Sequence, residues 1–400
     1  MSLQINRPYP LSFFNKASKA FGYKPKIEVD DLIKSARKKT KLKNFNDESF
    51  VEPLEILLES INNEARLHNI GLLITRIRLT DILANRLRVE EYIRKSPECL
   101  EDEVSPAVLI TGLQRTGTTK LHRLLSADPK IRYLRSWEGL NPVPLKKTDN
   151  SDRIKAARLS EKALKYIAPD FFAIHPVEHN APEEEVLLLD MQFLSTVAEA
   201  TMYVPGYAIW NQNQDQTPAY EYMKRVVKVL QHQRKKPYWV MKSPHHLEFL
   251  NIFTKVFPKT SIIHTHRNPV ETLASFCSMV FYSRVIFSNH VDPNEVAKHW
   301  VKKADIMLRQ CLRFRDRNPD SKVIDVWYKD LISDSTQSIQ NIYSRLGMQL
   351  NEEAKELMKQ SESKNKQYKY GKHVYKLEDF GLEKKELENQ FSDYIKEFNL

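Results

Sequence analysis

A glycine-bearing stretch in the first third of the chain carries basic and hydroxyl side chains at the spacing of a phosphate-binding loop. Residues 112–119 read Gly-Leu-Gln-Arg-Thr-Gly-Thr-Thr, and their candidate ligand-binding members are Arg115, Thr116, Gly117, Thr118 and Thr119. The stretch follows a short apolar run and precedes leucines at helical spacing, so it should connect a strand to a helix. The first N–H groups of such a helix are unpaired and attract anions. Because Thr118 stands where nucleoside-triphosphate loops carry lysine, we expect phosphate to be bound in a different manner.

An arginine and a serine form a second candidate anion site. Arg267 follows the apolar stretch 261–266, Asn268 suits the cap of a helix, and Pro269 suits its first position. Ser275 comes eight residues after Arg267, about two helical turns along. Arginine suits phosphate because its planar fork can donate paired hydrogen bonds.

A lysine and a histidine lie at a third junction of the same kind. Lys242 ends a strand-like stretch, Ser243 suits a helix cap, and His246 falls in the first turn that follows Pro244. Strands that run in parallel end at one edge of a sheet, so this junction should border the same crevice as the loop. His246 is a candidate general base, and a histidine that only caps the helix is the alternative.

Glu138 is a second candidate for the general base. It follows the loop by one helix and one short stretch, 131–134, that reads as a strand. A right-handed crossover would return the chain to the edge of the sheet that carries the loop. A glutamate at the surface, or one that caps the next helix, is the alternative.

The elements that must hold these residues alternate between strand and helix. Strands are expected near 108–111, 131–134, 238–242, 261–266 and 322–328. This order predicts a three-layer α/β/α fold with a mostly parallel central sheet. We expect an N-terminal arm and helical region at 1–100, the α/β domain at 105–385 with a helical insertion at 141–236, and a C-terminal helix at 386–400.

The loop and the Arg267 junction together resemble the sulfotransferase superfamily. Its loop for the 5′-phosphosulfate group reads approximately Pro-(Lys/Arg)-(Ser/Thr)-Gly-Thr-Thr, and residues 114–119 match it except that Gln114 replaces the proline. In that superfamily an arginine and a serine at the spacing of Arg267 and Ser275 hold the 3′-phosphate of the donor. Its Tyr-x-Asp-Leu segment places a tyrosine near the adenine, which points to Tyr328 here.

The resemblance implies an enzyme that moves the sulfuryl group of 3′-phosphoadenosine 5′-phosphosulfate (PAPS) to a hydroxyl or amine without a metal. Arg115 and Lys242 would stabilise the departing phosphate, and Glu138 or His246 would take the acceptor proton. The Lys-x-His-Leu segment of the superfamily is Lys-x-x-x-His-Leu here, a departure that leaves the roles of Lys242 and His246 open. We lean towards Glu138 as the base.

The helical insertion suggests a large or apolar acceptor, because it contains aromatic residues. They are Tyr203, Tyr207 and Trp210.

A second feature of the insertion is the stretch 175–185, with His175, His179 and three consecutive glutamates. Prolines at 176 and 182 argue against a helix that would present both histidines to a metal, and the glutamates suit the start of a helix. Contact with the acceptor is the minor alternative for this stretch.

Composition favours an anionic partner but does not choose one. The net charge is +11, no apolar run approaches the roughly 18 residues of a membrane helix, and the N-terminus lacks the pattern of a secretory signal, so we expect a cytoplasmic protein.

A phosphate-loop kinase or nucleotide hydrolase is one rival function, although only Asp325 could offer an acidic side chain on a strand for magnesium. A nucleic-acid or membrane-surface binding protein that uses the lysine-rich stretch 364–376 is another. We expect a small or lipid-like acceptor and no nucleic acid, and we leave membrane contact and oligomeric state open.

Overall fold

A five-stranded sheet forms the centre of the computed structural model, which describes residues 5–20, 26–104, 107–146, 149–365 and 375–400. The strands lie in the order β2-β3-β1-β4-β5, and every neighbouring pair is parallel. Their bounds are β1 Ala107–Thr111, β2 Ile131–Arg132, β3 Tyr238–Lys242, β4 Ser261–His266 and β5 Val323–Trp327. The expected parallel α/β fold is confirmed.

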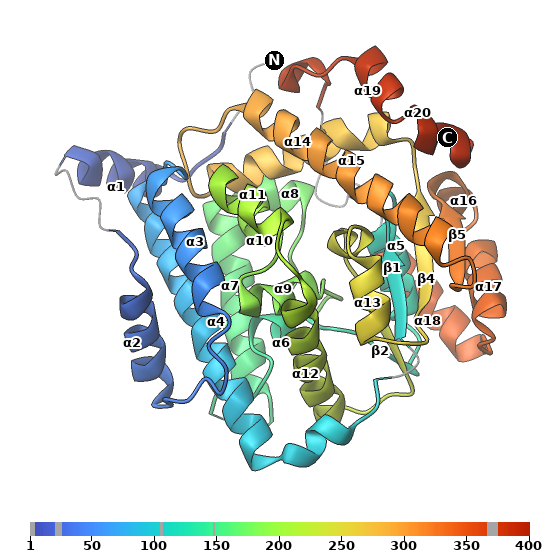
Figure 1. Ribbon diagram of the computed structural model, residues 1–400, viewed down its shortest axis with the longest axis horizontal. Helices are drawn as coiled ribbons and strands as arrows, with labels where there is room; N and C mark the ends of the chain where they lie inside the picture. Colours follow the sequence, from blue (N-terminus) through green and yellow to red (C-terminus); the bar gives the residue numbers. More distant parts are fainter. Residues whose placement is uncertain (1–4, 21–25, 105–106, 147–148, 366–374) are drawn as a thin grey trace.

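Helices make up most of the remaining chain (Figure 1). Those before the third strand are α1 Tyr9–Ala20, α2 Val29–Thr40, α3 Val51–Asn63, α4 Asn69–Lys95, η1 Pro97–Glu101, α5 Thr118–Leu125, α6 Ser136–Leu140, α7 Ser151–Ile167, α8 Pro169–Ile174, α9 Val186–Leu189, η2 Asp190–Gln192, α10 Val197–Thr201, α11 Pro205–Gln212 and α12 Thr217–Gln233. Those after it are η3 Pro244–Leu247, α13 Leu250–Val256, α14 Pro269–Val285, α15 Pro293–Arg317, α16 Tyr328–Ser333, α17 Ser335–Leu346, α18 Glu352–Lys364, η4 Glu378–Phe380, α19 Lys384–Gln390 and α20 Ser392–Glu397. Two short helices therefore stand where one C-terminal helix was expected.

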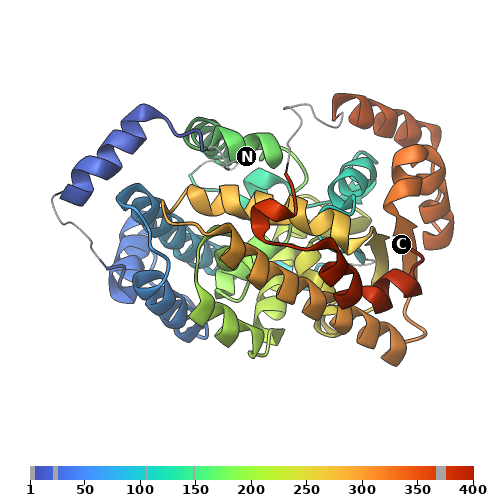
Figure 2. The ribbon, with the colours of Figure 1, turned by 90° about the horizontal axis from the view of Figure 1, so that it is seen from above.

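The two faces of the sheet bury alternate residues of each strand, as the twofold period of a strand requires. Leu109 and Ile262 share one core with α12, α15 and the C-terminal helices. Ile110 and Ile263 share another with α5, α17 and α18. Seen from above, α14 and α15 lie side by side across the middle of the molecule (Figure 2). The sheet is thus covered on both faces, which explains its continuous apolar strands.

A separate core holds the N-terminal helices together, at the left of Figure 1. Leu54 of α3 and Leu83 of α4 are fully buried there, together with Phe193 and Tyr207 from the insertion. The described residues of 141–236 form helices and no strand. None of the helices in the described part of the chain combines the length and apolarity needed to cross a membrane.

The register of the sheet sets the edge that carries the chemistry. Ile110 of β1 pairs with Lys242 at the end of β3, and Thr111 pairs with His264 near the end of β4. Since all three strands are parallel, the segments after Thr111, Lys242 and His266 leave the sheet along one edge.

We predict that Gly112→Ala will damage this edge. Gly112 has φ +149°, and a Cβ there would lie 2.3 Å from Thr265 Oγ1 and 2.5 Å from Thr265 O. The methyl group would have to push the loop away from β4, and overpacking of this kind costs about 1–3 kcal/mol. Unfolding in urea should show the loss.

Gly347→Ala is the matched control, because Gly347 also has positive φ, +71°, but no atom lies within 4 Å of its added Cβ. A Gly112→Ala protein that is as stable as the Gly347→Ala protein would contradict the steric argument.

Candidate functional site

The loop between β1 and α5 is fixed to the neighbouring strand. Thr116 Oγ1 donates to Leu113 O at 2.6 Å and lies 2.6 Å from Thr265 Oγ1 of β4. Gly117, at φ +94°, begins α5, and an added Cβ would lie 3.1 Å from Tyr328. The expected strand, loop and helix are therefore present, with the N-terminus of α5 at the carboxyl edge of the sheet.

Residues from three segments of the chain meet at this loop. Arg115 Nε donates to Ser275 Oγ of α14 at 3.1 Å, and Arg267 Nη1 donates to Arg115 O at 3.2 Å. The guanidinium carbon of Arg267 lies 4.3 Å from the centre of the Tyr328 ring. Arg267 also forms an exposed ion pair with Glu271, of a kind that contributes little to stability. The structure thus brings together the residues predicted to bind the donor, and what they bind stays a prediction.

A pair of glutamates that sequence reasoning did not select lies against Lys242. The Lys242 ammonium is buried and contacts Glu184 Oε1, while Ser243 Oγ donates to Glu184 Oε2 at 2.9 Å. The backbone N–H of Lys242 donates to Glu185 Oε2 at 2.7 Å. Thr111 Oγ1 donates to Ser243 O at 3.1 Å, which joins this group to β1. Lys242 and Glu184 therefore form a partly buried ion pair next to the loop.

The two carboxyl groups differ in their electrostatics. Burial raises the pKa of Glu185 to about 8, so this side chain is mostly protonated at neutral pH. The Glu184 carboxylate instead accepts hydrogen bonds from the Lys242 ammonium and from the Ser243 hydroxyl. A carboxylate at the edge of the site, beside a neutral carboxylic acid, is an arrangement that can accept a proton.

His175 also belongs to this region. Burial lowers its pKa to about 4, and the charges of Glu184, Lys242 and Arg115 act on it. His175 directly follows the short helix α8, and its ring centre lies 5.8 Å from that of Phe171 on that helix. The stretch 175–185 thus lies at the site, although the start of a helix was the favoured interpretation of its glutamates and contact with the acceptor the minor one. The signal in the sequence was the run of glutamates directly before a buried apolar helix.

Glu138 has the partners of a structural residue. Its two carboxylate oxygens accept hydrogen bonds of 2.9 Å from both terminal nitrogens of Arg132, and both side chains are buried. Glu138 Oε2 also accepts from the backbone N–H of Arg135 at 3.0 Å, within a capping box. The Arg132 guanidinium lies over the Trp239 ring, at the opposite end of β3 from Lys242. These contacts argue against the general-base role expected for Glu138.

His246 lies in an aromatic cluster beneath the site. Its Nδ1 is 2.8 Å from Tyr220 Oη, and its ring centre is 4.9 Å from that of Phe253. Burial lowers the pKa of His246 to about 3, and Nε2 has no partner within the described structure. A fully buried, neutral imidazole among aromatic rings is poorly placed to take a proton from an acceptor.

The three aromatic residues of the insertion that were expected to suit an apolar acceptor do not line the site either. Tyr207 is buried in the N-terminal core, where its hydroxyl donates to Phe193 O at 2.7 Å. Trp210 packs against the same core, and Tyr203 lies under the Arg66 guanidinium at 5.0 Å. The lysine-rich stretch 364–376 falls largely outside the described residues, which omit 366–374.

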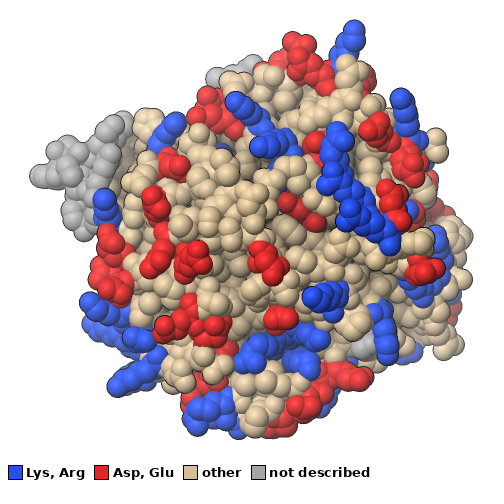
Figure 3. Space-filling view, viewed as in Figure 1, with Lys and Arg blue, Asp and Glu red and all other residues tan. Residues whose placement is uncertain are grey.

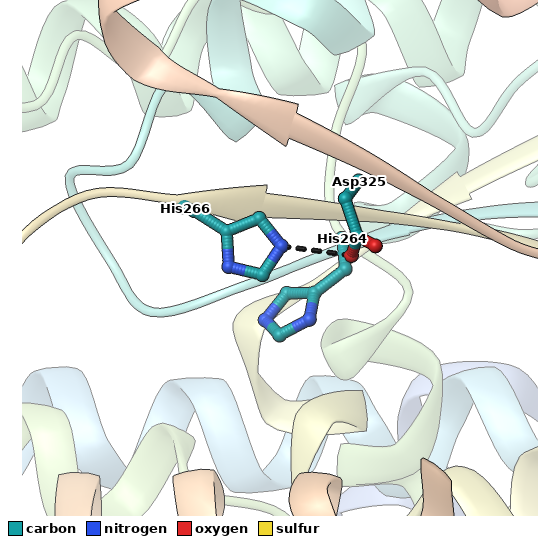
Figure 4. A group of neighbouring side chains, drawn as sticks. All are labelled: His264, His266 and Asp325. Atoms are coloured by element: carbon teal, nitrogen blue, oxygen red, sulfur yellow. Dashed lines mark hydrogen bonds and ion pairs between the residues drawn. The ribbon is translucent and has the colours of Figure 1, made fainter. Parts of the chain in front are cut away.

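Two histidines and an aspartate cluster behind the site, where β4 and β5 meet the C-terminal helices (Figure 4). His264, His266 and Asp325 offer ligand atoms within 4.8 Å of one another. However, Arg315 donates to both oxygens of Asp325 at 2.6 and 2.9 Å, and His266 Nε2 lies 2.9 Å from Oδ1. His266 Nδ1 in turn lies 2.8 Å from Tyr394 Oη. We call these five residues the C-terminal clasp.

The C-terminal clasp fits a structural role better than a metal site. Burial alone would raise the pKa of Asp325, but hydrogen bonds from His266 and Arg315 lower it, so the carboxylate is ionised and already neutralised by a guanidinium. A cation would have to compete with Arg315 for the same oxygens. Asp325 is therefore not available as the magnesium ligand that a kinase or nucleotide hydrolase needs.

We predict that Glu138→Gln will destabilise the fold. The change removes a carboxylate from a buried ion pair and leaves the Arg132 charge uncompensated, which costs about 3–5 kcal/mol in comparable cases. Chemical unfolding monitored by circular dichroism would measure the loss. Adding Arg132→Met to the variant should restore part of it, and an unchanged stability with lost turnover would return Glu138 to the list of bases.

Comparisons with known proteins agree with the arrangement of the site. A family model described as "Sulfotransferase family" matches residues 106–352. The fold is similar to sulfotransferase STF1 from Mycobacterium tuberculosis H37Rv, with a TM-score of 0.82 and 27% identity over 93% of this chain and 100% of that one. It is also similar to sulfotransferase STF9 from Mycobacterium avium, with a TM-score of 0.85 and 25% identity over 93% and 97% of the two chains. A comparison with curated proteins finds no match.

Proposed function

Because this chain belongs to the sulfotransferase family, we propose that it transfers the sulfuryl group of PAPS to a hydroxyl or amine of an acceptor. The observation that carries the choice of donor is the meeting of Arg115, Ser275, Arg267 and Tyr328 beside a phosphate-type loop. PAPS carries phosphates at both the 3′ and 5′ positions, and this cluster offers two arginines and a helix N-terminus to hold them.

The donor would be held in two parts. The loop N–H groups and Arg115 take the 5′-phosphosulfate, at the start of α5. Arg267 and Ser275 take the 3′-phosphate, and phosphate replaces the exposed Glu271 carboxylate as the partner of Arg267. Tyr328, whose ring already lies against Arg267, borders the adenine.

Transfer then requires charge neutralisation and one proton acceptor. The acceptor oxygen forms a bond to sulfur as the bond from sulfur to the bridging phosphate oxygen breaks, and the electron pair of that bond leaves with 3′-phosphoadenosine 5′-phosphate. Arg115 and Lys242 stabilise the departing charge. The donor competes with Glu184 for the Lys242 ammonium, so the Glu184 carboxylate becomes free to take the proton of the acceptor.

The acceptor would approach from the side of α8. His175 presents a half-buried imidazole beside the ion pair of Lys242 and Glu184, and the Phe171 ring lies against that imidazole. An acceptor with an apolar body and one hydroxyl or amine suits these neighbours, since the ring can contact the body while the carboxylate receives the proton.

We predict that Arg267→Ala will weaken binding of 3′-phosphoadenosine 5′-phosphate far more than binding of adenosine 5′-monophosphate. A hydrogen bond to a charged group contributes about 1.5–3 kcal/mol, and only the first ligand has the 3′-phosphate. Calorimetry with both ligands would measure the difference. Arg313→Ala, at an exposed position of α15, is the control that should change neither affinity. Equal losses for both ligands in the Arg267→Ala protein would refute the assignment.

We predict that Glu184→Gln will lower turnover by about 10²–10⁴-fold while the donor still binds, because the amide cannot accept the proton. Steady-state assays with a radiolabelled donor would test this. Glu138→Gln is the comparison variant, and per folded molecule it should keep its turnover. A Glu184→Gln enzyme with normal turnover would exclude Glu184 as the base.

The pH profile provides an independent check on histidine as the base. An ordinary histidine base would lose activity as the pH falls through about 6.5. Burial lowers the pKa of His246 to about 3 and that of His175 to about 4, so both stay neutral between pH 8 and pH 6 and neither should cause a fall near pH 6.5. A change near pH 8 would come instead from Glu185, whose pKa burial raises to about 8. A fall near pH 6.5 that disappears in a His246→Ala protein would reverse this conclusion.

A further inference from the structure

We propose that the N-terminal segment, residues 5–20 and 26–43, binds the surface of an anionic membrane and holds the acceptor side of the enzyme against it. Three independent observations support the proposal. They are the exposed apolar side chains, the distribution of charge, and the attachment of the segment to helices that lead to the site. Binding to the membrane does not depend on the reaction, whereas its link to an amphiphilic acceptor rests on the proposed function.

The first observation is an exposed apolar face at the rim of the molecule, where both views show α1 at the outer edge (Figures 1 and 2). Tyr9 is 79% exposed and Phe13 is 62% exposed, one helical turn apart, with ring centres separated by 6.4 Å. Ile5, just before the helix, is 48% exposed. On α4, which packs against α1 and α2, Leu73 and Ile77 are also more than half exposed. Half of the ten large hydrophobic residues exposed in the described structure therefore belong to this one region.

The second observation is the charge of the same part of the chain. Residues 1–45 contain eleven lysines and arginines but only three acidic residues, a balance of +8 out of the net +11 of the whole protein. No acidic residue occurs before Glu28. Basic side chains are visible over α2 at the lower left of Figure 3, and Lys34, Lys38 and Lys43 are among the exposed ones.

This combination identifies the kind of partner. A helix with aromatic side chains on an exposed face and a strongly basic neighbourhood is suited to the boundary between lipid headgroups and acyl chains. Its basic residues are attracted to anionic lipid headgroups, and its tyrosine and phenylalanine enter the interface. Nucleic acid would also attract the charge, but it would not explain the aliphatic residues Ile5, Leu73 and Ile77.

The third observation is that the segment is attached to the helices beside the site. The backbone N–H of Asn6 donates to Asp170 Oδ2 at 2.7 Å, at the start of α8. Arg7 donates to Val285 O at 2.5 Å, at the end of α14. Helix α8 leads to His175, and α14 carries Ser275 ten residues before Val285, about 15 Å along the helix. The segment that would bind the membrane is therefore tied to the two helices that lead to His175 and Ser275.

Vesicle co-sedimentation of the full chain tests the proposal. The protein without donor or acceptor is mixed with vesicles of phosphatidylcholine alone, or of phosphatidylcholine with phosphatidylglycerol. We expect binding to the anionic vesicles, at least tenfold weaker binding to the neutral ones, and loss of binding as salt is raised. No binding to the anionic vesicles at low salt would overturn the proposal.

Two sets of variants assign the binding to its residues. Tyr9→Ser with Phe13→Ser should weaken vesicle binding at least tenfold, and so should Lys34→Gln with Lys38→Gln and Lys43→Gln. The controls are Ile209→Ser, at a residue that is 63% exposed on α11, and Lys384→Gln with Lys385→Gln, at exposed positions of α19; they should bind normally. Unchanged thermal unfolding would show that the variants fold.

Further outcomes show whether a membrane, a second copy of the chain or nucleic acid binds this segment. Vesicle binding that survives the Tyr9 and Phe13 changes would overturn the proposal, as would a dimer in sedimentation velocity that needs these residues in a protein that binds no vesicles. A labelled oligonucleotide that binds more tightly than the anionic vesicles and competes with them would assign the surface to nucleic acid instead. Transfer to a small acceptor in the absence of vesicles is measured separately, so a failure of the proposed function would be seen on its own.

Discussion

The close approach of the loop backbone to strand β4 is the constraint on which the rest of the site depends. Gly112 lies so near Thr265 that a single added carbon would overlap both its hydroxyl and its carbonyl. The hydroxyl of Thr116 then meets that of Thr265, so the loop cannot move away from the strand without breaking a buried contact. This holds Arg115 within reach of Ser275, and Arg267 follows because it bonds the carbonyl of Arg115. The positions of Arg115 and Arg267 are thus set by the packing of the loop against the sheet.

The parts of this arrangement that were predictable are those whose signals are local. A cap residue followed by proline marks the start of a helix within two residues, and the pairs Asn268-Pro269 and Ser243-Pro244 do so next to apolar strands. Parallel strands then bring such junctions to one edge, so the grouping of Arg115, Arg267 and Ser275 could be foreseen from the order of elements.

The roles of the carboxylates and histidines depended on partners that no local pattern reveals. Glu138 is held by Arg132, and His246 by Tyr220, which comes from a helix 26 residues earlier in the chain. Glu184 is the opposite case, a residue that looks structural in the sequence and lies at the site in the fold. Among two other glutamates and shortly after a proline, it is typical of a helix start. Only the folded chain, in which β3 pairs with β1, shows that it meets Lys242 beside the loop. Burial decides whether a titratable side chain can exchange a proton with a substrate or serves only a structural role. The burial of a side chain depends on the whole fold and cannot be read from its neighbours in the sequence.

The C-terminal clasp has a consequence for the order in which the protein can assemble. His266 and Tyr394 are separated by 128 residues in the sequence, yet their contact closes the edge of the sheet next to Arg267. A ribosome that adds about 5–20 residues per second needs roughly 6 to 26 s to make that interval. During this time the loop, β3 and β4 are already available, and α15 can cover His264 through Cys311, which lies 3.8 Å from its Nδ1. The His266 ring still lacks Tyr394 and Phe398, which pack against it in the finished fold. The last helices therefore complete the burial of His266 seconds after β4 is made.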